Sequence, residues 1–247
     1  MDDGHVDKSS AMNSPLSPGG RVLRIVGIIL MALTAAFNLM GGIGTACVAL
    51  NPTGWSPAMA KLAPYQWLYI LLMVVATATA IWGIVVTIAL ARGTSGHAYR
   101  DALIVLAISA LAAGVQTFVS QVLRGKGAPQ NMRFYLTLFT LAFMLVLRLP
   151  PIWKLIGGFR RGSPGDAATT AGLAAFAGGM VTLTTPLWAA PTHIGPDGAN
   201  WVNALRTPLL AGGAIGMMLG VGLVWLGSHK SVRRTAENPE GRPATGG

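Results

Sequence analysis

The sequence predicts an all-α, polytopic integral membrane protein: a bundle of six transmembrane helices with both termini in the cytoplasm. Of its 247 residues, 52% are hydrophobic and 11% are charged, whereas soluble domains carry about 25% charged residues. Apolar runs recur that can cross a hydrocarbon core about 30 Å thick at about 1.5 Å per residue. Basic residues flank these runs, so the net charge of +10 indicates anionic lipid headgroups as partners and no nucleic acid.

Composition divides the chain into a membrane domain, residues 21–227, and two polar tails. Residues 1–20 and 228–247 are rich in Ser, Pro, Gly or charge and are predicted to be disordered cytoplasmic tails, the C-terminal one basic. The six spans are expected at about 22–50, 66–91, 102–123, 134–149, 167–190 and 205–226.

Local signals bound the first three spans. The first follows Arg21 and Arg24, and its 29 residues exceed one untilted crossing, so the glycines at 41, 42 and 44 offer a place to bend or end the helix. The second begins beside Tyr65 and Trp67, rings typical of a membrane interface. The third follows Asp101, which suits a helix N-terminus.

The last three spans differ in how clearly they are marked. The fourth ends at Pro150 and Pro151, which cannot continue an undisturbed helix. The fifth is built from Ala, Gly and Thr, and its weak hydropathy leaves open whether it crosses fully. The sixth is strongly apolar and carries a repeat of glycines.

The distribution of basic residues predicts the orientation. With six spans, thirteen basic residues fall on the side of the tails and five on the other side. The positive-inside rule then predicts that both termini lie in the cytoplasm. The membrane is expected to be the plasma membrane. The five opposing residues are Lys61, Arg124, Lys126, Arg133 and Arg206. Three of them belong to the loop 124–133, which is unexpectedly basic for an extracytoplasmic loop.

Several chemistries are excluded because their residues are missing. All eight Asp and Glu residues and all four histidines lie in tails, loops or helix ends, which counts against proton relays and haem ligation between helices. The sequence contains no HExxH, GxSxG or Walker loop, and the single Cys47 cannot form an intrachain disulfide. No catalytic residue, cofactor or metal site is therefore predicted.

Uncharged polar residues concentrate in three of the spans. If the tails are cytoplasmic, spans one, three and five run outward, and these residues all fall in the outer halves of their helices. They predict an uncharged polar cleft that opens outward, with seven candidate lining residues: Asn38, Gln116, Ser120, Gln121, Thr182, Thr184 and Thr185. The competing interpretation is packing, since such side chains also form hydrogen bonds between membrane helices or to their own backbone.

A second pattern lies in the sixth span. Gly212, Gly216 and Gly220 repeat every four residues, and such a face lets another helix approach closely. That helix could belong to this chain, to a second copy of it or to another membrane protein.

Three functions stay open at this point. A noncatalytic membrane subunit or scaffold, which packs through small-residue helix faces, is the first hypothesis. A channel or transporter for a small neutral or weakly polar solute, which would use the polar cleft, is the alternative. A membrane enzyme is third, because acid–base residues occur only in loops, as His193 with Asp197 or His97 with Asp101.

Overall fold

The computed structural model describes residues 17–54, 56–93, 96–125, 127, 130–159, 164–190, 194, 198 and 200–237. This part of the chain contains no strand, and six of its helices are long and apolar enough to cross a membrane. The all-α prediction with six apolar helices is confirmed. The weakly hydropathic fifth segment forms one of them, over residues 167–189.

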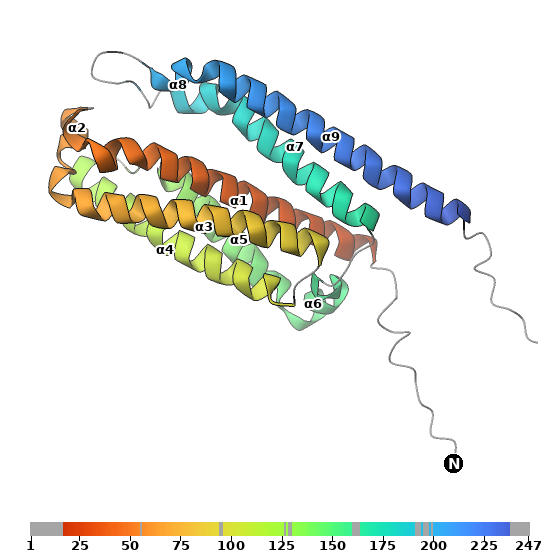
Figure 1. The fold of residues 1–247 in the computed structure, drawn as a ribbon. Coiled ribbons are helices and arrows are strands. Elements are labelled where there is room, and N and C mark those ends of the chain that lie inside the picture. Colours follow the sequence, from red (N-terminus) through yellow and green to blue (C-terminus); the bar gives the residue numbers. More distant parts are fainter. Residues whose placement is uncertain are drawn as a thin grey trace, which may run out of the picture.

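Four of the long helices form an up-and-down bundle (Figure 1). They are α1 (Pro18–Leu50), α3 (Gln66–Arg92), α4 (Ala98–Arg124) and α5 (Gln130–Leu147). Each packs against the next in chain order, and α5 closes the ring by packing against α1. Left-handed glycines end two of these helices, Gly93 after α3 and Gly125 after α4, where only glycine adopts a positive φ without strain.

Short helical elements mark the two ends of the bundle. At one end, η2 (Pro52–Gly54), α2 (Pro57–Ala60) and η3 (Ala63–Tyr65) connect α1 to α3. At the other, α6 (Pro150–Leu155) and η4 (Gly157–Phe159) follow α5. These are named the α2 end and the α6 end. The start of α1 and the C-terminal end of α9 both lie toward the α6 end (Figure 1).

The remaining long helices, α7 (Pro164–Ala189) and α9 (Arg206–Glu237), form a hairpin connected through α8 (Trp201–Ala204). The hairpin lies along one side of the bundle (Figure 1) and touches it through α7, which packs against α1 and α3. Phe37 of α1 stacks on Trp188 of α7 with ring centroids 5.8 Å apart. The protein is therefore a four-helix bundle with a two-helix hairpin beside it.

Helix ends differ from the predictions at both tails. Helix α1 begins at Pro18, inside the predicted tail 1–20, because the hydroxyl of Ser17 accepts a hydrogen bond from the Gly20 amide at 3.1 Å and Pro is favoured in a first turn. Helix α9 continues to Glu237, ten residues into the predicted tail 228–247. Hydropathy marks where an apolar stretch ends, and a helix can continue past it. The other tail residues, 1–16 and 238–247, lie outside the described residues.

The glycines of the first span do not end the helix, because α1 runs unbroken from Pro18 to Leu50. Two of them serve close packing instead. A Cβ atom on Gly42 would come within 2.5 Å of the Thr77 hydroxyl on α3, and one on Gly41 would come within 2.6 Å of Arg133 on α5. The small residues therefore mark sites of close approach in the bundle.

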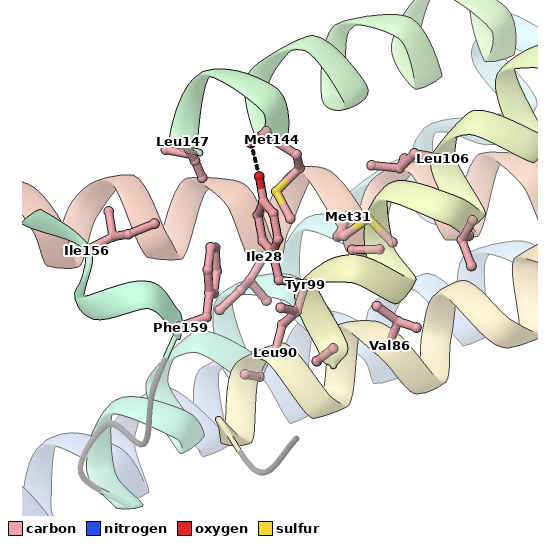
Figure 2. Close-up of a cluster of buried hydrophobic side chains, with 14 residues drawn as sticks. Ile28, Met31, Val86, Leu90, Tyr99, Leu106, Met144, Leu147, Ile156 and Phe159 are labelled. Atoms are coloured by element: carbon pink, nitrogen blue, oxygen red, sulfur yellow. Dashed lines mark hydrogen bonds between the residues drawn. The ribbon is translucent and has the colours of Figure 1, made fainter. Parts of the chain in front are cut away.

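An apolar cluster fills the bundle at the α6 end. Figure 2 shows side chains from α1, α3, α4 and α5 converging there, with Phe159 and Ile156 covering them from below α5. The hydroxyl of Tyr99 donates a hydrogen bond to the backbone carbonyl of Met144 (Figure 2). Ile28, Leu90, Leu106, Met144, Leu147 and Ile156 are each at most 1% exposed. This region is named the apolar core.

Candidate functional site

A layer of buried polar side chains lies between the apolar core and the α2 end. Its members are at most 3% exposed, and we name the set the polar layer: Thr34, Asn38, Thr45, Gln116, Arg133, Thr137 and Thr140. On α1 the members are spaced by four and seven residues, and on α5 by four and three, so each helix contributes one face. The layer is thus built by α1, α4 and α5 together.

Three helices meet at Gln116 of α4, which is 0% exposed. Its Nε2 donates to the Thr45 hydroxyl of α1 at 2.7 Å, and its Oε1 accepts from Nη2 of Arg133 on α5 at 2.8 Å. The Thr45 hydroxyl donates in turn to the Gly41 carbonyl at 2.6 Å. Both ends of the amide are used, which fixes its orientation.

Arg133 is the one layer member with a charge, and it is 3% exposed. Its Nη2 binds Gln116, but its Nε and Nη1 have no hydrogen-bond partner. Three of the five guanidinium N–H groups are carried by those two nitrogens. Gly41 makes room for the side chain, since a Cβ there would lie 2.6 Å from Nη1 and 2.7 Å from Cδ.

No acidic side chain of the four bundle helices is placed to neutralise Arg133. The four bundle helices contain a single acidic residue, Asp101, which lies fifteen residues before Gln116 on α4 and hence about 22 Å away along the helix. Asp101 also contacts Arg100, with an N···O distance of 3.5 Å. A buried, unpaired charge costs several kcal/mol, and an ionisable residue inside a membrane bundle indicates function unless it is otherwise explained.

Two other arginines of the bundle, Arg24 and Arg148, lie at the α6 end and contact carbonyl or aromatic groups. Nη2 of Arg24 reaches the Leu90 carbonyl at 3.4 Å, and the Arg24 guanidinium lies 5.9 Å from the Phe159 ring centre at the α6 end. Arg148 stacks 4.7 Å from the ring centre of Trp153. Packing against these groups and the nearby aqueous boundary account for both side chains.

The rest of the polar layer lies toward the apolar core. The hydroxyls of Thr34 and Thr140 share a hydrogen bond of 2.8 Å between α1 and α5. Thr137 donates to the carbonyl of Arg133 at 2.8 Å. Asn38 donates from Nδ2 to the Thr34 carbonyl at 2.9 Å, but its Oδ1 is buried without a partner. The layer therefore contains an unpaired acceptor as well as unpaired donors.

Apolar packing closes the layer at the α2 end as well. Leu62, just before η3, is 0% exposed and packs with Ala49 and Tyr69. Gln66 ties this segment to α1 by donating to the Ala49 carbonyl at 2.9 Å. The Tyr69 hydroxyl contacts the Ser120 hydroxyl at 2.9 Å on the border of the layer. The polar layer thus lies between two apolar clusters.

The predicted cleft residues divide into two groups. Asn38 and Gln116 lie in the polar layer and Ser120 borders it, whereas Gln121 is exposed and donates to the Gly125 carbonyl at 3.3 Å. Thr182, Thr184 and Thr185 lie on α7, outside the four-helix bundle. Each donates to a carbonyl of its own helix, within four residues and at 2.9 to 3.1 Å. The structure therefore does not bring all seven together.

The prediction that the polar region is uncharged needs a correction. From the sequence Arg133 is expected in the loop 124–133, yet it lies in the first turn of α5 and points into the bundle. A charge next to a loop normally indicates an interfacial side chain, so the burial was missed. The spacing of Arg133, Thr137 and Thr140 on one helix face could have revealed it.

The glycine face of α9 packs inside the chain. A Cβ on Gly220 would lie 2.6 Å from the Phe176 backbone nitrogen of α7, and one on Gly216 would lie 3.1 Å from Gly179 Cα. Gly213, beside the predicted repeat, is equally close to Leu183. A Cβ on Gly212 would meet no atom within 4 Å. The face that approaches α7 is thus formed by the glycines at 213, 216 and 220.

Of the four loop residues in the enzyme hypothesis, the structure describes His97 and Asp101. His97 precedes α4 without a side-chain capping bond, and His193 and Asp197 lie outside the described residues. No group of three His, Cys, Asp or Glu side chains that could hold a metal ion occurs in the described part. Comparisons with protein-family models, curated proteins and solved structures found no match to this chain.

Proposed function

We propose that this membrane protein binds a small polar solute in the polar layer of its four-helix bundle. The observation that carries the proposal is Arg133, buried without an acidic partner on the bundle helices and with two nitrogens unpaired. A bundle selected only for packing gains nothing from such a group, because the desolvation of a charge opposes folding. A solute that supplies hydrogen-bond acceptors would offset that cost.

The closed ends favour a carrier or receptor over an open channel. The apolar core seals one end of the layer and the cluster around Leu62 seals the other. A continuously open pore would need a hydrated path past residues such as Leu106 and Met144, which are fully buried. Binding sites of carriers typically lie between such closures, near the middle of the membrane.

A plasma-membrane location with cytoplasmic termini belongs to the same proposal. Because Arg133 points into the bundle, it no longer counts as a loop charge, and four basic residues then oppose the thirteen on the side of the tails. The positive-inside rule is therefore followed more closely than the loop 124–133 alone indicated. In this orientation the α2 end faces outward.

A noncatalytic subunit is the second candidate, and one observation favours it. Only 11% of the apolar stretch of α9 is buried, against 44% of that of α4. The remaining surface of α9 is available to lipid or to another membrane protein. The glycine face itself supports this candidate less, because Gly216 and Gly220 pack against α7.

The experiment compares two glutamines of the same helix, buried Gln116 and exposed Gln121. The protein is purified from its own membranes in a mild detergent, and native mass spectrometry records its mass with everything retained. We expect a stoichiometric small molecule on the unmodified protein, its loss in Gln116→Leu and its retention in Gln121→Leu. A bare protein, or equal retention in both variants, would contradict the proposal. A reproducible partner protein would favour the second candidate.

A further inference from the structure

We propose that the polar layer recognises a small monocarboxylate that carries a hydroxyl group beside its carboxylate. This inference rests on the proposed function and names the chemical class of the solute. It assigns the carboxylate to Arg133 and the neighbouring donor group to Asn38.

The charge of the layer selects a monoanion. Arg133 is its one charged member, so a ligand with one negative charge leaves the closed layer neutral, whereas a dianion leaves an unpaired negative charge in a region of low dielectric. The unpaired nitrogens, Nε and Nη1, can donate to carboxylate oxygens, which guanidinium groups bind strongly. Gln116 holds the third nitrogen at 2.8 Å and so limits the orientations of the guanidinium.

Asn38 supplies the second recognition element. Its amide orientation is set by the Nδ2 bond to the Thr34 carbonyl, which leaves Oδ1 as a buried acceptor without a donor. Asn38 precedes Gly41, the residue in contact with Arg133, by three residues of α1, or about 4.5 Å along the helix axis. A small ligand with its carboxylate at Arg133 therefore carries its donor toward Asn38 when the donor is on the adjacent carbon atom.

The layer holds no second cation, and apart from Arg133 its side chains are neutral: Asn38, Gln116 and four threonines. A carboxylate is therefore favoured over a phosphate, which carries between one and two negative charges at neutral pH and is usually bound by several cations or backbone amides. Both are oxyanions, so the test must separate them.

The test measures the thermal unfolding midpoint, Tm, of the full chain in detergent with four probes: lactate, propionate, inorganic phosphate and glycerol. Lactate differs from propionate by the hydroxyl that Asn38 would bind. At about 100 times its Kd, lactate should raise the Tm by about 5 °C or more, and propionate should raise it less. Phosphate and glycerol should have little effect.

Variants assign the effect to residues. Arg133→Met should abolish the shift by lactate, whereas Arg124→Gln, a partly buried arginine at the α2 end, should keep it. Asn38→Leu should make lactate and propionate equivalent. If Arg133→Met fails to fold, Gly41→Ala serves in its place, because its Cβ displaces the guanidinium without removing it.

Three results would overturn the inference. In the first, glycerol raises the Tm of Arg133→Met but not that of Gln116→Leu. This result would keep the proposed function but reject a carboxylate as the ligand. An equal or larger shift by phosphate would reject the monocarboxylate in favour of another oxyanion. No shift with any probe would reject this ligand class, and the proposed function would then fall only if native mass spectrometry also found a bare protein.

Discussion

In the α7–α9 hairpin two helix backbones touch, whereas in the polar layer of the four-helix bundle side chains fill the space between the helices. Backbone atoms of α7 lie 2.6 to 2.8 Å from the positions where Cβ atoms on Gly213 and Gly220 would be. Between α1, α4 and α5 the connections are side-chain hydrogen bonds, among them Thr34 to Thr140 and Thr45 to Gln116.

This difference teaches where the molecule tolerates change. Backbone contacts have no adjustable parts, so close packing of the hairpin depends on the absence of side chains. Hydrogen-bonded side chains can exchange partners, which binding of the proposed solute would require. Unpaired polar atoms such as Nη1 of Arg133 are found in the bundle, and these atoms carry the proposal that the bundle binds a solute.

The largest effect is expected from a large side chain at the hairpin contact. Gly220→Leu would place atoms on the backbone of Phe176 and Gly172, which cannot move locally, so α7 and α9 must separate. We expect a destabilisation of about 3 kcal/mol or more, measured as a lower Tm. Gly212→Leu is the matched control, because a Cβ there meets no atom within 4 Å. Equal effects of the two substitutions would show that the backbones do not touch at this contact.

A smaller effect is expected at the contact between α1 and Arg133. Gly41→Ala displaces the guanidinium and weakens its bond to Gln116, at a cost of about 1 to 3 kcal/mol, partly offset by about 1 kcal/mol of helix propensity. Gly44→Ala gains the same propensity without a close contact. Thermal unfolding of both variants should therefore give Gly41→Ala a lower Tm than Gly44→Ala. The reverse order would mean that Arg133 does not lie against α1.

The smallest effect concerns single hydroxyls. Thr140→Val removes the bond to Thr34 between two helices and should destabilise the protein by about 0.6 to 2 kcal/mol. Thr184→Val removes only bonds to the carbonyls of its own helix and should change stability by less than about 0.5 kcal/mol. Thermal unfolding of the two variants compares bundle with hairpin, and equal losses would contradict the distinction between them.

Part of the candidate site could be predicted from sequence and part could not. Asn38 and Gln116 were recognisable because an amide inside an apolar run stands out whatever it contacts. The threonines of α7 looked equivalent to these amides as candidates for the cleft. A threonine in a helix can donate to its own backbone or to another helix, and sequence alone does not distinguish the two. Arg133 was missed because its position at a helix end gave it an ordinary explanation.

Sequence by itself determined the all-α class, the six apolar segments and the missing catalytic motifs, because hydrocarbon thickness and backbone hydrogen bonding leave few solutions for such a composition. It also marked Gly216 and Gly220 as sites of close approach, but not the contacts of Gly41 and Gly42. Only the tertiary structure decided that Gly213, Gly216 and Gly220 pack against α7, and that Arg133 joins Gln116 and Thr45 in one layer. These outcomes depend on which helix faces meet. Because the apolar faces are similar in sequence, packing between residues far apart in the chain decides which of them meet.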